Sequence, residues 1–271
     1  MDLTKVKLVV FDMDGTLLNP KGQVSQRFFS LFNKLQKKDI LFCAASGRQY
    51  HSIIEKLAPI KEAIYIIAEN GGVAKKGAEV LLLKAIAASK VNEILPVLRN
   101  IKETHIVLCT QETAFIESKD ATFINLFQEY YHNYRIVDDL AAVAKINPIL
   151  KIATYHFSSS ENFIYPAVQH LESEYLIKIS GQNWLDISTP GVHKGNALKE
   201  IQLLLNISKE ETMVFGDYLN DLEMFKEADF SFAMQNAHKE LKKKAKYITR
   251  SNLEFGVEEV LEMLLQAKTQ T

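Results

Sequence analysis

Near both ends of the chain, short apolar runs alternate with segments in which apolar side chains recur every three or four residues. Five short runs rich in Val, Ile and Phe predict strands: 7–11, 40–46, 63–69, 212–216 and 230–234. Helical spacing predicts helices in five other segments: 28–35, 49–57, 196–205, 219–227 and 257–265. Nearly continuous hydrophobic strands separated by helices are typical of a parallel sheet covered on both faces. These regions therefore predict an α/β core with a Rossmann-like parallel sheet.

The middle of the chain shows a different pattern. Strands are predicted in 103–118 (two, around a polar turn), 150–158 and 174–188, and helices near 89–100 and 161–173. Adjacent strands joined by short turns indicate an antiparallel sheet with helices on one side. We therefore expect a core domain formed by 1–83 and 185–271, and an α+β domain inserted at 84–184.

The composition is that of an ordinary globular protein, with 271 residues, 47% hydrophobic and 24% charged. The 32 basic and 33 acidic residues are spread along the chain, and the net charge of −1 favours neither nucleic acid nor a membrane surface as a partner. No apolar stretch approaches the roughly 20 residues of a membrane span. Cys43 and Cys109 lie in apolar runs and are expected in the core, which fits a reducing compartment. We expect a cytoplasmic protein, with no sign of an obligate protein partner.

Polar side chains follow the predicted strands at the point where each strand ends. They are Asp12 and Asp14 after the first strand, Ser46, Gly47 and Arg48 after the second, Asn70 after the third, and Asp217, Asn220 and Asp221 after the fourth. Lys194 stands at the start of the helix before that fourth strand. In an open parallel sheet, ligands bind outside the carboxyl ends of the strands. We therefore expect these side chains to meet at one edge of the sheet.

This set of side chains suits a dianion together with a hard cation. Carboxylates on rigid strand ends bind Mg²⁺, which keeps some waters and bridges to a phosphate oxygen. N–H groups of glycine-containing turns and the Ser46 hydroxyl suit the other phosphate oxygens, and Lys194 can neutralise phosphate and carboxylate as a point charge. The residues thus predict adjoining Mg²⁺ and phosphate sites. There Asp12 can attack phosphorus and Asp14 can protonate the leaving oxygen.

Each motif has a simpler interpretation when taken alone. An aspartate–glycine pair is a common turn, Ser46 is a common type of helix cap, and Asp217 and Asp221 suit the start of a helix. Arg48 can grip a substrate or form an ion pair. Together the simpler interpretations require several coincidences at one edge of one sheet, so the joint functional interpretation is preferred.

Four segments resemble the motifs of a known family. "DMDGTLL" (12–18), "SGR" (46–48), "KGNAL" (194–198) and "GDYLND" (216–221), in that order, resemble the haloacid dehalogenase (HAD) superfamily, and more narrowly its Cof-type class IIB phosphatases. "AENGG" (68–72) is similar to the asparagine–glycine turn that these phosphatases carry before their cap domain. The resemblance implies that the inserted domain is an α+β cap of the C2B type.

The resemblance also implies roles for individual residues. Asp12 would form an aspartyl-phosphate, Asp14 would be the general acid–base, and Lys194 would stabilise the phosphoryl group and orient Asp12. The implied Mg²⁺ ligands are Asp12, Asp14 (through its backbone carbonyl), Asp217 and Asp221. The implied substrate or phosphate contacts are Ser46, Gly47, Arg48, Asn70, Lys194 and Asn220. An aspartate at position 14 favours phosphoryl transfer over dehalogenation, because the dehalogenases of the family lack it.

The expected function is a Mg²⁺-dependent phosphatase that hydrolyses a small phosphorylated metabolite, such as a sugar phosphate, through an aspartyl-phosphate. A phosphosugar mutase on the same scaffold is an alternative, and would isomerise hexose phosphates with a bisphosphate primer and release little phosphate. A second alternative is a regulatory protein that binds a phosphorylated metabolite without turning it over.

Overall fold

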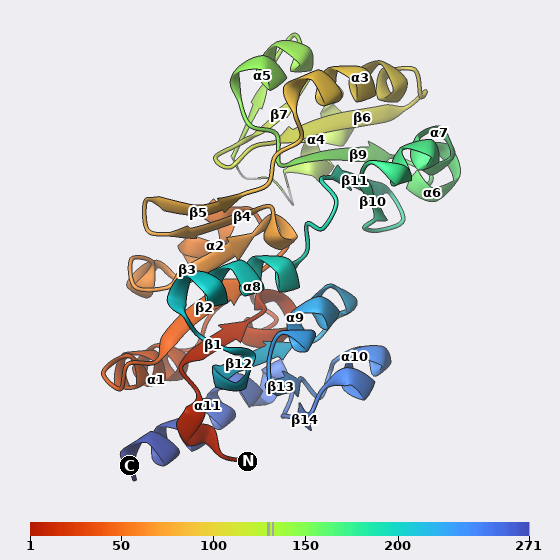
Figure 1. Cartoon of the computed structure of the whole chain (residues 1–271). Coiled ribbons are helices and arrows are strands. Elements are labelled where there is room, and N and C mark those ends of the chain that lie inside the picture. The colour runs from red at the N-terminus through yellow and green to blue at the C-terminus, as the bar shows by residue number, and fades with distance from the viewer. Residues whose placement is uncertain (129–130, 132, 271) are drawn as a thin grey trace. The chain divides into compact units, whose positions relative to one another are not determined.

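The computed structural model describes residues 1–128, 131 and 133–270. The chain forms two compact units: the first contains Met1–Leu82 and His193–Thr271, and the second contains Leu83–Val192 (Figure 1). The expected end of the insertion at residue 184 is wrong, because Trp184–Ser188 is a strand (β11) of the second unit. It pairs along its length with β9 (Lys151–His156), so 185–192 belong to the second unit.

The first unit is built on an eight-stranded sheet in the order β14-β13-β12-β1-β2-β3-β4-β5. The strands are β1 (Leu8–Phe11), β2 (Leu41–Ala45), β3 (Tyr65–Ala68), β4 (Val73–Lys76), β5 (Glu79–Leu83), β12 (Thr212–Gly216), β13 (Phe230–Ala233) and β14 (Tyr247–Ile248). The pairs from β14 to β3 are parallel, and β4 returns antiparallel to β3. The five predicted strands are confirmed, whereas β4, β5 and β14 were not predicted.

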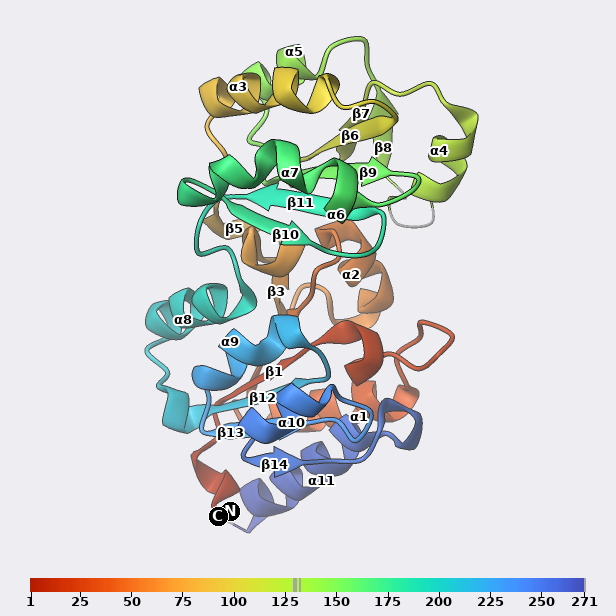
Figure 2. The same cartoon turned by 90° about the vertical axis from the view of Figure 1, so that its right-hand side faces the viewer.

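Helices cover both faces of this sheet, as expected (Figure 2). They are α1 (Gln26–Gln36), α2 (Tyr50–Lys56), α8 (Lys194–Leu205), α9 (Leu222–Lys226), α10 (Lys239–Lys244) and α11 (Gly256–Thr269). Helix α1 packs on α11, and α8 packs on α9. Ser25 caps α1 by accepting from the N–H of Phe28, and Phe28, Leu31, Phe32 and Leu35 form its buried stripe. The apolar periodicity thus fixes which helix faces pack on the sheet.

The second unit contains a six-stranded sheet in the order β10-β11-β9-β6-β7-β8. Its other strands are β6 (Thr104–Cys109), β7 (Ala114–Ile116), β8 (Tyr134–Ile136) and β10 (Leu176–Ile179), and its helices are α3 (Ala88–Arg99), α4 (Ala121–Phe127), α5 (Leu140–Ile146), α6 (Ser160–Phe163) and α7 (Tyr165–Val168). The pairs are antiparallel except β7 with β8. The helix predicted at 161–173 is broken into short pieces, and Pro166 stands at the start of one of them, where its missing N–H is tolerated.

The expectation that helices cover one side of this second sheet is wrong. Ile106 and Leu108 of β6 lie in a core with α3 and α5, whereas Val107 and Cys109 lie in a second core with Phe123 of α4. Because successive strand residues point to opposite faces, α4 covers the other face. Cys109 and Cys43 are both buried, as predicted for core residues.

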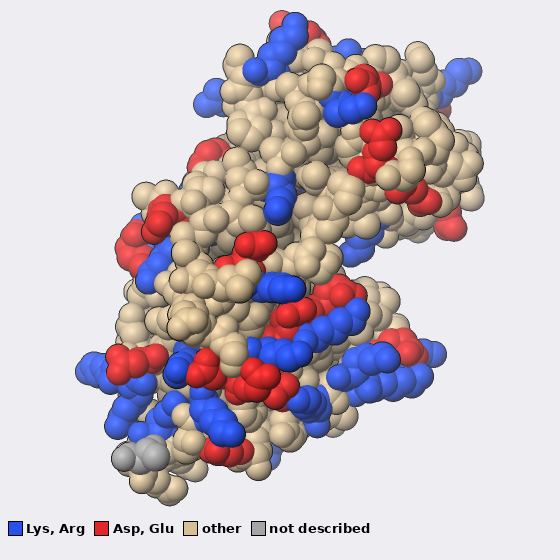
Figure 3. Space-filling model, viewed as in Figure 1, with Lys and Arg blue, Asp and Glu red and all other residues tan. Residues whose placement is uncertain are grey.

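On the face shown in Figure 3, acidic and basic side chains lie interspersed, so neither sign of charge dominates that face. Within the described part of the chain, no helix has both the length and the hydrophobicity needed to cross a membrane.

Candidate active site

The chain turns sharply where β1 ends. Asp12 still pairs with the sheet, because its N–H donates to the carbonyl of Phe215 (3.1 Å). Met13–Leu17 then form a turn in which the backbone angles of Asp14 and Gly15 are not helical. Gly15 has φ +73° in this turn, and a Cβ built there would lie 2.2 Å from Oδ2 of Asp217. Only glycine therefore lets the loop after β1 approach the loop after β12 so closely.

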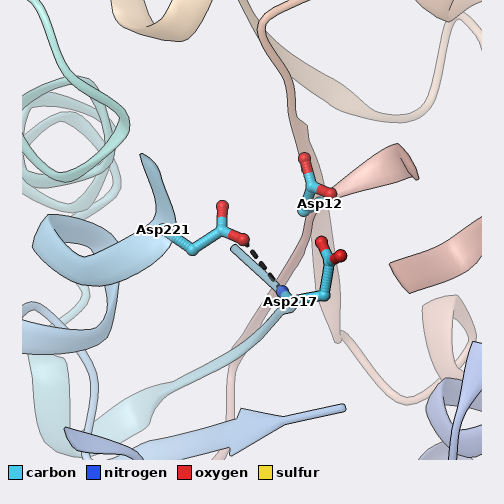
Figure 4. Close-up of side chains that lie close together, drawn as sticks. All are labelled: Asp12, Asp217 and Asp221. Atoms are coloured by element: carbon cyan, nitrogen blue, oxygen red, sulfur yellow. Dashed lines mark hydrogen bonds between the residues drawn. The ribbon is translucent and has the colours of Figure 1, made fainter. Parts of the chain in front are cut away.

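Three carboxylates meet at these strand ends (Figure 4). Asp12, Asp217 and Asp221 each offer an oxygen within 4.8 Å of the others. Lys194, the first residue of α8, donates from Nζ to Oδ1 of Asp12 (2.5 Å) and to Oδ1 of Asp221 (2.7 Å). The side chains of Lys194 and Asp221 are fully buried, and that of Asp12 is 7% exposed. The structure thus brings together four of the predicted site residues, from opposite ends of the chain.

Asp221 also anchors the loop in which it lies. Its second oxygen, Oδ2, accepts from the N–H of Asp217 (3.0 Å) and of Tyr218 (3.2 Å) (Figure 4). Both oxygens of Asp221 are therefore engaged by donors of the chain itself. Among the three acids, Asp221 holds Lys194 and the loop in place.

Burial dominates the electrostatics of this cluster. Loss of solvation raises the pKa of Asp12 to about 8, against the opposing charge of Lys194 and with a further contribution from the charge of Asp221. Burial and the charge of Asp221 raise the pKa of Asp217 to about 6. Burial by itself would lower the pKa of Lys194, but the charges of Asp12 and Asp221 outweigh it and raise that pKa. When all three carboxylates are ionised, they leave an excess of two negative charges over the single ammonium, the charge that one divalent cation neutralises.

A polar group links the ends of β2, β3 and β12 beside these acids. The N–H of Asn70 donates to the carbonyl of Ser46 (2.9 Å), and Oδ1 of Asn70 accepts from Nδ2 of Asn220 (3.1 Å). A Cβ on Gly47 would lie 2.9 Å from Nδ2 of Asn70, so glycine is needed for this approach. The predicted phosphate-binding residues Ser46, Gly47, Asn70 and Asn220 therefore lie together.

Asp14 and Arg48 form a separate pair. Nε and Nη2 of Arg48 donate to the two carboxylate oxygens of Asp14, both at 2.6 Å, and 55% of the Asp14 side chain is exposed. The Asp14 carboxylate does not belong to the group of three acids. Of the two roles left open for Arg48, the ion pair is the one that the structure shows.

A family model for haloacid dehalogenase-like hydrolases matches residues 9–261, nearly the whole chain. The chain belongs to the haloacid dehalogenase-like hydrolase family. The resemblance read from the four motifs is thereby confirmed.

Individual haloacid dehalogenase-like relatives are phosphatases. The chain is 33% identical over 272 residues to 5-amino-6-(5-phospho-D-ribitylamino)uracil phosphatase YbjI of Escherichia coli, covering 96% of this chain and 97% of YbjI. A crystal structure from Eubacterium rectale superposes with a TM-score of 0.91 at 27% identity, covering 96% and 99% of the two chains. The subclass IIB sugar phosphatase BT4131 shares the fold, with a TM-score of 0.78 at 22% identity over 95% and 98%. The predicted enzyme class, a phosphatase hydrolase, is confirmed, and so is the fold class.

Sequence reasoning missed three residues that shape this haloacid dehalogenase-like site. Thr16 donates from Oγ1 to Oδ1 of Asp217 (3.3 Å), Asn236 donates from Nδ2 to the carbonyl of Gly15 (2.8 Å), and the N–H of His238 donates to the carbonyl of Asp217 (2.7 Å). Thr16 lies inside the first of the four motifs, "DMDGTLL" (12–18). For Asn236 and His238 the available signal was their position just after the predicted strand 230–234.

Proposed function

We propose that the chain is a Mg²⁺-dependent phosphomonoesterase that hydrolyses small phosphorylated metabolites through an aspartyl-phosphate on Asp12. The observation that carries the proposal is the buried group of Asp12, Asp217, Asp221 and Lys194, which has an excess of two negative charges when its three acids are ionised. A structural cluster would gain nothing from keeping so much uncompensated charge away from water. In a site for a divalent cation and a phosphate, this negative charge binds the cation.

The donor set fits Mg²⁺. Carboxylate oxygens on rigid backbone are the ligands this hard cation prefers, and Asp12 and Asp217 would hold it. Asp221 would act behind them, since Lys194 and two N–H groups already occupy its oxygens. The predicted ligand role of the Asp14 backbone carbonyl stays a prediction. When bound, the ion supplies charge neutralisation for a phosphate oxygen.

The residues of the chain then divide the remaining work. Lys194 holds the Asp12 carboxylate by one oxygen and fixes its direction of attack on phosphorus. The hydroxyl of Ser46 and the amides of Asn70 and Asn220, which lie together, would bind the phosphoryl oxygens. These donors stay in place during the reaction, which is how positioned dipoles stabilise developing charge.

Protons would move through Asp14. As Asp12 forms its bond to phosphorus, the bond to the leaving oxygen breaks and that oxygen takes the proton of Asp14. In the second step Asp14 takes a proton from water, whose oxygen attacks the aspartyl-phosphate and releases inorganic phosphate. The carboxylate of Asp12 is regenerated.

We assign substrate selection to the second unit, as an α+β cap. It is inserted after β5, and it has its own sheet and two cores. YbjI and YcsE of Bacillus subtilis, which is 25% identical over 252 residues, are both named as phosphatases of 5-amino-6-(5-phospho-D-ribitylamino)uracil. That compound is therefore the first substrate to test, beside hexose phosphates.

A panel of phosphorylated metabolites, assayed for phosphate release with Mg²⁺ and with a chelator, tests the proposal. We expect release that requires Mg²⁺ and that Asp12→Asn abolishes. The matched control is Asp229→Asn, which removes a surface carboxylate paired with Lys246. Isomerisation of hexose phosphates without phosphate release would establish a mutase instead. Tight binding of a metabolite without any turnover would establish a binding protein.

A further inference from the structure

Asp14 is held by a fork of two hydrogen bonds from Arg48. Nε donates to Oδ2 and Nη2 donates to Oδ1, so both carboxylate oxygens are engaged. Two parallel bonds fix the plane of a carboxylate as well as its position. The direction of Asp14 is thus set by a residue of another strand end, on the loop between β2 and α2.

Arg48 is itself fixed by its neighbours. Its N–H donates to Oγ of Ser46 (3.1 Å), its carbonyl accepts from the N–H of Glu69 (3.0 Å), and Nη1 donates to Oγ of Ser52 on α2 (3.1 Å). Backbone and guanidinium are therefore both anchored. Arg48 is a rigid support against which the more exposed Asp14 is oriented.

The same contacts fit poorly with a direct role of Arg48 in binding phosphate. Each of its three side-chain nitrogens already donates to Asp14 or to Ser52, and its charge is paired with Asp14. Three of the five N–H groups of the guanidinium are used in this way, and a phosphate that bound its Nε–Nη2 edge would have to displace Asp14. That is the carboxylate on which the proposed proton transfers depend.

From this geometry we infer that Arg48 is a positioning residue that orients Asp14 for proton transfer and does not bind the phosphoryl group. The inference rests on the proposed function, since it takes Asp14 as the acid–base. It separates Arg48 from Ser46, its neighbour in the same motif, which keeps the role of phosphate contact.

Competition by inorganic phosphate separates the two roles of Arg48. In Arg48→Ala, we expect the inhibition constant for phosphate to stay within about twofold of wild type, while kcat for an alkyl phosphate falls on the order of 10- to 100-fold, the usual cost of misplacing a catalytic group. Arg48→Lys should recover only part of the loss, because an ammonium cannot form the fork. Ser52→Ala, which removes the support of Nη1, should show a smaller loss in kcat.

The dependence of the rate on the leaving group distinguishes a positioning role of Arg48 from a merely structural one. A merely structural role would affect aryl and alkyl phosphates equally. The p-nitrophenolate ion leaves without being protonated, so its release in a single turnover of p-nitrophenyl phosphate does not need Asp14. In Arg48→Ala, we expect this release to keep the wild-type rate within about threefold, whereas turnover of glucose 6-phosphate falls.

Arg27 offers a matched control in the same unit. It forms the same kind of fork with Glu262, Nε donating at 2.9 Å and Nη2 lying 2.7 Å away, between α1 and α11. Arg27→Ala should leave all of these constants unchanged. A tenfold weaker inhibition by phosphate in Arg48→Ala, or equal losses on the aryl and alkyl substrates, would overturn the inference. Absence of phosphatase activity in the wild-type chain is a different result: it overturns the proposed function, and the inference falls with it.

Discussion

Nζ of Lys194 lies 2.5 Å from Oδ1 of Asp12, although the two residues stand 182 positions apart in the chain. The lysine side chain is fully buried and has a second carboxylate partner in Asp221. The ammonium of this buried group therefore contacts two of its three acids. We expect the stability and the activity of the chain to depend on this balance of charge and on the loops that hold the four side chains in place.

Replacing Lys194 by methionine removes the positive charge and leaves the acids facing one another. We expect Lys194→Met to lower the free energy of unfolding of the metal-free chain by about 3 to 5 kcal/mol, the usual cost of breaking a buried ion pair, and to abolish turnover. Urea unfolding measures the first effect. Lys226→Met, which breaks an exposed pair with Glu223, is the control and should cost less than about 1 kcal/mol. A loss of similar size in both variants would contradict the prediction.

Stability of the metal-free chain should fall as pH rises. The pKa of Asp12 is raised from 3.8 to about 8 by burial, so between these values the folded chain binds more protons than the unfolded chain. By linkage, the free energy of unfolding decreases with increasing pH over that window, and Asp217, with a pKa raised to about 6, adds to the slope.

Mg²⁺ should reverse this loss, because it takes the place of the protons. We expect the rise in melting temperature on adding Mg²⁺ to be larger at pH 8 than at pH 5.5, and binding to release protons at pH 7. Thermal melts with Mg²⁺ or a chelator, and calorimetry in buffers of different ionisation enthalpy, measure the two effects. A stabilisation by Mg²⁺ that did not change with pH would contradict the assignment of the cation to these acids.

Gly15 should not tolerate a side chain. We expect Gly15→Ala to weaken Mg²⁺ binding at least tenfold, because the new Cβ would lie 2.2 Å from Oδ2 of Asp217 and force that carboxylate away. Gly22→Ala is a close control: Gly22 also has a positive φ, +67°, but its Cβ would meet only Nζ of Lys56, at 3.9 Å. Both variants share the backbone strain, so the difference in Mg²⁺ affinity isolates the clash. Equal affinities would show that Asp217 can move without cost.

The pair of Asn70 and Asn220 should act on phosphate binding. We expect Asn220→Ala, which removes the donor to Oδ1 of Asn70, to raise KM and the inhibition constant for inorganic phosphate about tenfold, the cost of one hydrogen bond to a charged group. Steady-state kinetics with phosphate as inhibitor check this. Asn162→Ala, an exposed residue of the second unit, should change neither constant. An unchanged inhibition constant in Asn220→Ala would remove this pair from the phosphate site.

The sequence was sufficient to predict the buried centre of the site. Because parallel strands end at one edge, the order of motifs alone predicted that Asp12 and Asp217 lie together, and Lys194 at the start of α8 was expected close to these acids; it contacts Asp12 and Asp221. The direction of Asp14 could not be predicted in the same way. Its backbone position follows from the motif, but its side chain is turned toward Arg48, 34 residues away, and such a contact depends on the loop conformations of two strand ends.

Two errors in the fold have different physical origins. The break in the helix at 161–173 was visible in the sequence, because Pro166 lacks the N–H that a helix interior needs. The strand β5 was missed although four of its five residues are apolar, and these side chains are exposed or half-buried because β5 lies at the edge of the sheet. Its partner β4 has the buried Lys75 within it, which masks its apolar pattern. Edge strands are set by pairing more than by burial, and composition predicts them poorly.

The position of β1 between β2 and β12 has a consequence for biosynthesis. The ribosome makes β1, β2 and β3 first, then the entire second unit, and only afterwards the segment that pairs with the other side of β1. Until residues 212–216 emerge, the central strand of the nascent protein presents an open apolar edge, the kind of surface on which unfinished chains associate. Asp12, the proposed nucleophile, is thus among the first residues to be synthesised and among the last to acquire its native surroundings.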